Sequence, residues 1–234
     1  PPIFLGGQGG LVGPARIGFG TVIAAGTVWR GDCPEGGMLL RGEGRQAAAE
    51  AFHSGLYGDI RRRVTNNVLY LANLHALRQW YLHVRFPFPG DPEMGDGLLR
   101  GALETLETAI AERLTRLGAL SQKMETSQGL AERFLPEESR AVILRQQSQF
   151  HDRWPELGAC LGEMREEEAG REARDQFLGE LSAARAEQGD DYLRVIRSLD
   201  QSSRSSGTAW LRQVVDAVSE RAFAHVPACR GGIS

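Results

Sequence analysis

Residues 99–124 read LRGALETLETAIAERLTRLGALSQKM. Apolar side chains recur in this stretch every three or four residues, which is the period of one face of an α-helix. A second such stripe crosses residues 60–81, and weaker ones cross 137–150, 156–187, 192–199 and 208–225. The two strong stripes are Leu99, Leu103, Leu106, Ile110, Leu114, Leu117, Leu120 and Met124, and Ile60, Val64, Val68, Leu71, Leu74, Leu77 and Tyr81.

These stripes predict five or six amphipathic helices. Short connections between consecutive helices favour an antiparallel bundle. The alternative is that one long helix stands apart from the others and pairs with another subunit.

Residues between the stripes mark where helices begin and end. Prolines within 85–92 should stop the first helix, and Pro136 followed by two glutamates should start a later one. Gly189 and Asp191 are expected to end one helix and cap the next. The serine-rich stretch 201–207 is predicted to be a polar linker.

The N-terminal region has a different period. Residues 11–33 divide into LVGPAR, IGFGTV, IAAGTV and WRGDC, in which an apolar residue opens each six-residue unit. Such hexads are typical of a parallel β-helix, whose interior receives the opening residue of each short strand. The openers Leu11, Ile17, Ile23 and Trp29 should therefore point inward. An ordinary antiparallel hairpin is the alternative.

The fold class predicted from both regions is mainly α, and α+β overall. Residues 1–44 are expected to form the last coil or coils of a β-helix, and residues 45–234 a helical bundle. Because stacked repeats need neighbours, and because the chain opens on Pro1, we expect the chain to be the C-terminal fragment of a longer protein.

Composition narrows the classes of function. The chain has 234 residues and a formal charge of −3, which gives no electrostatic argument for nucleic-acid binding. No apolar run is long enough to cross a bilayer, so a soluble, cytoplasmic protein is expected. The three cysteines are far apart and odd in number, so we expect them to be reduced.

Arg16, Arg30 and Asp32 are the candidate ligand contacts. Adjacent charges at the corner of a coil could recognise a carboxylate or a phosphate, although a solvated pair at the rim fits the same residues. Glycines 6, 7, 9 and 10 lack the spacing of a phosphate-binding loop. The run Arg61–Arg63 is expected to be solvated surface, because consecutive residues fan around a helix.

The sequence offers no catalytic or metal-binding motif. Its five histidines, His53, His75, His83, His151 and His225, occur in no such pattern. The acidic run of Glu163 and Glu166–Glu168 is expected to be a solvated helix face. We therefore expect no metal site, no cofactor and no complete active site in this fragment.

The segments IFLGGQGGLVGP and RIGFGTVIAAGTV, residues 3–14 and 16–28, resemble the end of the left-handed β-helix in bacterial UDP-N-acetylglucosamine pyrophosphorylase-related proteins. The resemblance covers about 40 residues. It implies a hexapeptide-repeat nucleotidyltransferase or acyltransferase parent that assembles as a homo-oligomer, usually a trimer. It also implies a sugar nucleotide, and acyl-CoA or Mg²⁺, as ligands of that parent.

Acyltransferases of this kind use a histidine of the coil as base. The present chain has no histidine before His53, so no catalytic residue is carried over. The resemblance therefore implies an assembly or accessory region of a transferase. The alternative is a non-catalytic helical module that recruits a protein partner, for which an exposed apolar groove between helices would be the sign.

Overall fold

The computed structural model describes residues 3–5, 7, 9–42, 53–88, 97–164 and 168–231. The chain divides into two compact units, Pro1–Phe52 with Ile233–Ser234, and His53–Gly232. The boundary predicted between residues 44 and 45 lies outside the described residues.

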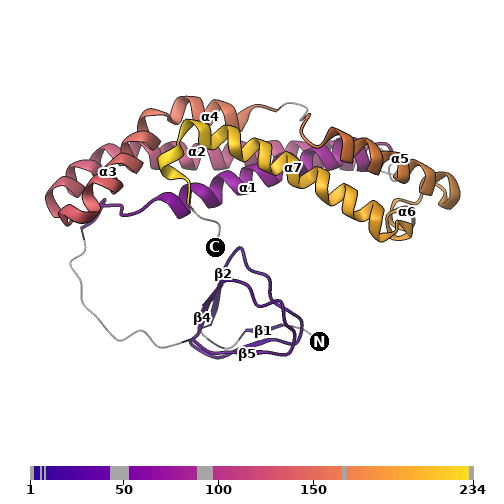
Figure 1. The fold of residues 1–234 in the computed structure, drawn as a ribbon, viewed down its shortest axis with the longest axis horizontal. Helices are drawn as coiled ribbons and strands as arrows, with labels where there is room; N and C mark the ends of the chain where they lie inside the picture. The colour runs from indigo at the N-terminus through magenta and orange to yellow at the C-terminus, as the bar shows by residue number, and fades with distance from the viewer. Residues whose placement is uncertain are drawn as a thin grey trace. The chain divides into compact units, whose positions relative to one another are not determined.

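The first unit is built from short parallel strands (Figure 1). They are β1 (Phe4–Leu5), β2 (Gly10–Val12), β3 (Val22–Ile23), β4 (Val28–Arg30) and β5 (Leu39–Leu40). One sheet has the order β1-β3-β5 and the other pairs β2 with β4. An isolated parallel bridge joins Ile17 to Cys33.

The pairing follows the six-residue repeat. Phe4 pairs with Val22 and Gly10 with Val28, three repeat units further along the chain in each case. Since every pair is parallel, the antiparallel hairpin alternative is wrong.

Side chains of the repeat form a small core. Ile23, Cys33 and Leu40 are buried, and the openers Ile17 and Trp29 pack against them. Leu11, the first opener, is 42% exposed on the edge strand β2. Gly18 allows neighbouring turns to approach, because a Cβ there would lie 2.5 Å from the Glu35 carbonyl oxygen.

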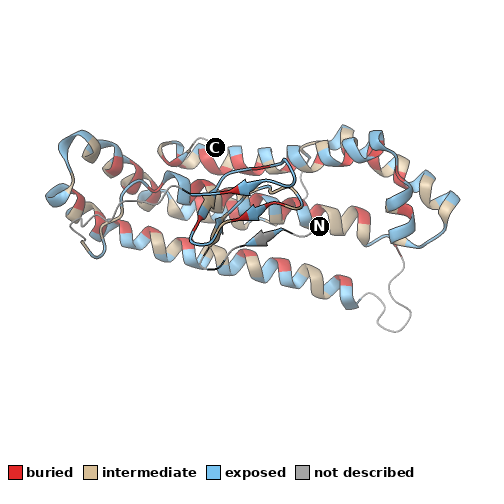
Figure 2. Ribbon diagram, turned by 90° about the horizontal axis from the view of Figure 1, so that it is seen from below, coloured by how far each residue is buried: buried red, intermediate tan, exposed pale blue. Residues whose placement is uncertain are grey.

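The second unit is helical, as predicted. Seven α-helices occur in the part of the chain that the structure describes: α1 (Arg61–Trp80), α2 (Gly97–Phe134), α3 (Glu137–Asp152), α4 (Trp154–Gly162), α5 (Arg171–Gln188), α6 (Tyr192–Ser198) and α7 (Gln201–His225). A π-helical turn, Tyr81–Arg85, continues α1, and a 3-10 turn, Pro227–Cys229, follows α7. Buried and exposed residues alternate along each helix (Figure 2).

Two predictions about helix boundaries need correction. The weaker helical stretch expected over 156–187, interrupted at Gly170, is two helices. Helix α4 ends at Gly162, where Glu163 is extended, and α5 begins after Gly170, which takes a positive φ of 75° and where a Cβ would lie 3.0 Å from the Trp210 carbonyl oxygen. The predicted linker 201–207 is the start of α7. Asp200 caps this helix, and Ser205 donates to the Gln201 carbonyl, so the polar side chains are satisfied within a helix.

Helices α1 and α7 lie side by side and antiparallel (Figure 1). The Thr65 hydroxyl, near the start of α1, donates to the Cys229 carbonyl beyond the end of α7. Around one end, α2, α3 and α4 contribute to a core that includes Ile110, Met124, Phe150, Leu157 and Val218. Around the other end, α5 and α6 contribute to a second core, which includes Val84, Phe177, Val195, Trp210 and Val214.

Glutamines of α3 hold the segments that flank α1 and α7. Gln147 Nε2 donates to the Tyr57 carbonyl at 2.6 Å, and Gln146 Oε1 accepts from the Ile60 amide at 3.2 Å. Gln149 Oε1 accepts from the Ala228 amide at 2.6 Å. Since buried main-chain groups need partners, these contacts fix the start of α1 and the end of α7.

Candidate functional site

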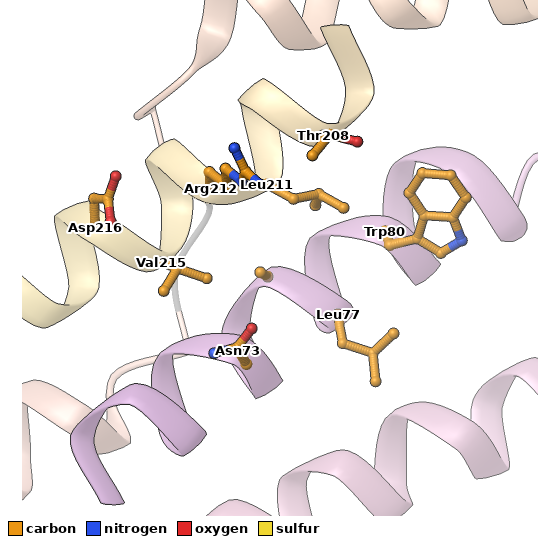
Figure 3. A pocket seen from close by; sticks show the side chains of 9 residues that line it. Asn73, Leu77, Trp80, Thr208, Leu211, Arg212, Val215 and Asp216 are labelled. Carbon is orange, nitrogen blue, oxygen red and sulfur yellow. The ribbon is translucent and has the colours of Figure 1, made fainter. Parts of the chain in front are cut away.

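A cavity of about 540 Å³ opens between α1 and α7 (Figure 3). Its lining combines an apolar floor with a few polar side chains at the rim. Helix α1 contributes Asn73, Ala76, Leu77 and Trp80, and helix α7 contributes Thr208, Leu211, Arg212, Val215 and Asp216.

The spacing of these residues explains the cavity. Asn73, Leu77 and Trp80 follow one another at four and three residues, so they share one face of α1. On α7, Thr208, Leu211 and Val215 have the same spacing. The buried stripe of α7, which includes Trp210, Val214 and Val218, lies one residue away and faces the cores. Each helix therefore has a core face and, beside it, a partly exposed apolar face.

A second cavity of about 410 Å³ continues from the first. Both are lined by Trp80, Thr208 and Leu211. The remaining lining residues of the second cavity come from α5, from α6 and the turn after it, and from the start of α7: Phe177, Ile196, Arg197, Leu199, Arg204 and Gly207. We call the two cavities together the α1–α7 groove.

Trp80 forms the wall shared by the two cavities and is held from two sides. Its indole Nε1 donates to the Tyr192 hydroxyl at 3.2 Å. Its ring centroid lies 5.6 Å from that of Phe177. A large aromatic surface is thus fixed in place, half-buried, within the groove.

Leu77 is the most exposed large apolar side chain of the groove, at 41%. Sequence periodicity predicts it to lie in the core stripe of α1, and this prediction is wrong. Its neighbours His75 and Gln79 are buried instead, at 3% and 1% exposure. His75 Nε2 is 2.9 Å from the Leu161 carbonyl oxygen, a hydrogen bond that a pattern of apolar residues does not reveal.

The charges of the groove differ between its ends. Arg212 and Asp216, one helical turn apart on α7, line the first cavity. Arg197 and Arg204 line the second cavity, whose lining includes no acidic side chain. The Arg204 guanidinium donates to the Arg197 carbonyl at 3.0 Å, and its charge also interacts with the nearby Asp200 carboxylate, whose pKa it helps to lower.

The candidate contacts predicted from the sequence lie in the β unit. The Asp32 carboxylate accepts from the Arg16 main-chain amide at 2.7 Å, and Arg30 lies in β4, paired with Val12. All three are exposed. Within the described ranges no ion pair joins Arg30 to Asp32, and Asp32 ties two neighbouring turns of chain together.

Most of the histidines and cysteines are held by contacts or by burial within the fold. His151 Nδ1 is 2.9 Å from the Ser121 carbonyl oxygen, and His53 stacks on Phe134. Burial raises the pKa of the Cys229 thiol to about 12, so it is protonated at neutral pH. Among the described residues no group of three or more His, Cys, Asp or Glu side chains could hold a metal ion. Glu166 and Glu167 lie outside the described residues.

None of the described helices is long and apolar enough to span a bilayer. Comparisons of the chain with protein-family models, with curated proteins and with solved structures found no match. The resemblance of residues 3–28 to the pyrophosphorylase-related proteins therefore remains a prediction.

Proposed function

We propose that the helical unit is a protein-interaction module whose α1–α7 groove receives an apolar helical segment of a partner. The observation that carries the proposal is the apolar lining of the groove, in which Leu77 is exposed in the first cavity and a fixed Trp80 is shared by both cavities. Grooves between two helices are a common receptor for amphipathic helices, which insert residues spaced by three and four.

The energetics favour such an occupant. Apolar surface removed from water contributes about 25 cal/mol per Å². Because Trp80 is already held by Tyr192 and Phe177, its side chain loses little freedom when a partner covers it. A rigid aromatic wall beside an exposed leucine is therefore well suited to anchor a partner.

The test is a selection of amphipathic helical peptides on the intact chain, followed by affinity measurement against two matched variants. Leu77→Glu places a charge inside the groove. Val142→Glu is the control: it places a charge at an apolar side chain of α3 that is 53% exposed and lies outside the groove. Selected peptides should lose at least about tenfold in affinity for Leu77→Glu, since a buried unpaired charge is costly, and should bind Val142→Glu normally. Equal binding to both variants would refute the proposal.

A second candidate function rests on the β unit. We propose that it is the end of a left-handed parallel β-helix and that the chain serves assembly, or accessory substrate contacts, in a cytoplasmic sugar-nucleotide pyrophosphorylase or acyltransferase-like protein. Support comes from parallel pairs three repeat units apart in both sheets. Leu5 adds to it, because it pairs in register with the buried Ile23 yet is itself 46% exposed on the edge strand. A further coil would cover Leu5.

This candidate predicts a homo-oligomer, with three copies expected, and ligand binding by the longer parent protein. The mass of the present chain in solution by light scattering tests the first point. Calorimetric titration of the chain and of the longer protein with UDP-N-acetylglucosamine and Mg²⁺, and with acetyl-CoA, tests the second. Binding by the longer protein alone is expected, and binding by neither would remove the transferase assignment.

A further inference from the structure

The two ends of the α1–α7 groove can be told apart by their lining residues. Along α7 the lining residues run from Arg204 through Thr208 and Leu211 to Asp216. The twelve residues that separate Arg204 from Asp216 span about 18 Å at the rise of an α-helix. A bound helix of about twelve residues therefore fits the length of the groove.

The two ends of the groove also differ in the charges of their lining residues. One end has the two arginines Arg197 and Arg204 with no acidic side chain in the lining, and the other has Arg212 together with Asp216. The chain as a whole has an excess of acidic residues, 30 against 27 basic ones. Asp200 interacts electrostatically with Arg204, so attraction of an acidic ligand to this end would come mainly from Arg197, against the negative net charge of the chain.

We propose that the partner is an amphipathic α-helix with acidic residues at the end that lies against Arg197 and Arg204. This inference rests on the proposed function and adds the chemistry of the partner to it. The apolar face of the helix covers Leu77, Trp80 and Leu211, which supplies most of the affinity. The carboxylates face the two guanidinium groups, which fixes the register and direction of the helix in the groove.

Arg197 is a better residue to substitute than Arg204, because its side chain has fewer contacts within the protein. Arg197 is exposed, lies in the last turn of α6 and has no hydrogen bond or ion pair from its side chain to any described residue. Arg204 in contrast donates to the Arg197 carbonyl in the last turn of α6 and interacts electrostatically with Asp200. Arg145, an exposed arginine of α3 outside both cavities, provides the matched control.

The experiment uses the intact chain and three synthetic peptides that share one apolar helical face and end in two glutamates, two glutamines or two lysines. The glutamate peptide should bind most tightly and the lysine peptide least. Arg197→Glu should weaken the glutamate peptide by about fivefold while leaving the glutamine peptide unchanged. Arg145→Glu should change neither, and high salt should reduce the preference.

The outcomes separate this inference from the proposed function. If all three peptides bind equally and only Leu77→Glu reduces their binding, the groove binds helices but the charge preference is refuted. If no peptide binds, both proposals are refuted. If sedimentation shows self-association that Leu77→Glu abolishes, or if laurate displaces the glutamate peptide at stoichiometric amounts, a second copy or a fatty acid is the occupant and the inference is overturned.

Discussion

The Trp80 indole donates a hydrogen bond to the hydroxyl of Tyr192, at 3.2 Å, and so joins the end of α1 to the start of α6. Both side chains are half-buried. The contact orients the aromatic wall of the groove and ties the short helix α6 to the long helix pair. The same contact therefore serves both the stability of the helical unit and the shape of its candidate binding surface.

Tyr192→Phe should destabilise the protein by about 1 kcal/mol, because it removes this hydrogen bond and leaves the indole N–H without its partner. Tyr70→Phe is the control, since its ring stacks under Arg113 and none of the described hydrogen bonds involves its hydroxyl. Urea unfolding of the three proteins measures the difference. Equal stabilities would show that the Trp80 contact contributes nothing.

Gly207→Ala should destabilise the protein by about 1–3 kcal/mol. A Cβ at this position of α7 would lie 2.9 Å from the Phe177 ring, whereas one at Gly179 in α5 meets nothing within 4 Å. Gly179→Ala should therefore stabilise the protein by up to about 1 kcal/mol through helix propensity. Thermal unfolding of the two variants should move the midpoint in opposite directions, and a parallel shift would contradict the packing described here.

The Asp200 cap predicts a pH dependence. Hydrogen bonds from the Ser203 amide and the Ser203 hydroxyl lower the pKa of Asp200 below its ordinary value. The carboxylate therefore contributes stability at neutral pH that is lost as the pH falls through the lowered pKa. Asp200→Asn, which keeps a side-chain oxygen for the cap, should flatten the acid limb of a plot of melting temperature against pH. An unchanged acid limb would show that Asp200 is not linked to folding.

The cysteines should differ in reactivity. Cys229 is completely buried, its pKa is raised to about 12, and its thiol lies 3.3 Å from the Gln146 carbonyl oxygen. Cys160 is only half-buried. Iodoacetamide at pH 8 should label Cys160 first and Cys229 only after unfolding, as mass spectrometry of the peptides can show. Rapid labelling of Cys229 in the native protein would mean that the end of α7 opens readily.

Sequence periodicity was sufficient for the main features of the fold. The stripe over 99–124 lies within α2, the start at Glu137 is that of α3, and the Asp191 cap precedes α6. These features depend on residues close in sequence, so local patterns contain the information. The hexads likewise predicted parallel pairing, because the repeat itself sets the register.

The α1–α7 groove could not be predicted in this way. Leu77 continues the apolar stripe of α1, but its exposure depends on α7, which follows more than a hundred residues later. The burial of His75 depends on a carbonyl of α4, and the helical state of 201–207 depends on the Asp200 cap and on Gly207 packing against Phe177. Long-range partners of single residues decide these positions, and a one-dimensional pattern does not report them.

The most direct test of the groove is the indole N–H signal of Trp80 in a nitrogen–proton correlation spectrum of the intact chain, recorded as a selected helical peptide is added. Trp80 lines both cavities, whereas Trp154 and the fully buried Trp210 line neither. A helix bound in the groove should shift the Trp80 signal in proportion to binding and leave those of Trp154 and Trp210 in place. A peptide that binds with its full affinity and leaves the Trp80 signal unmoved would contradict it.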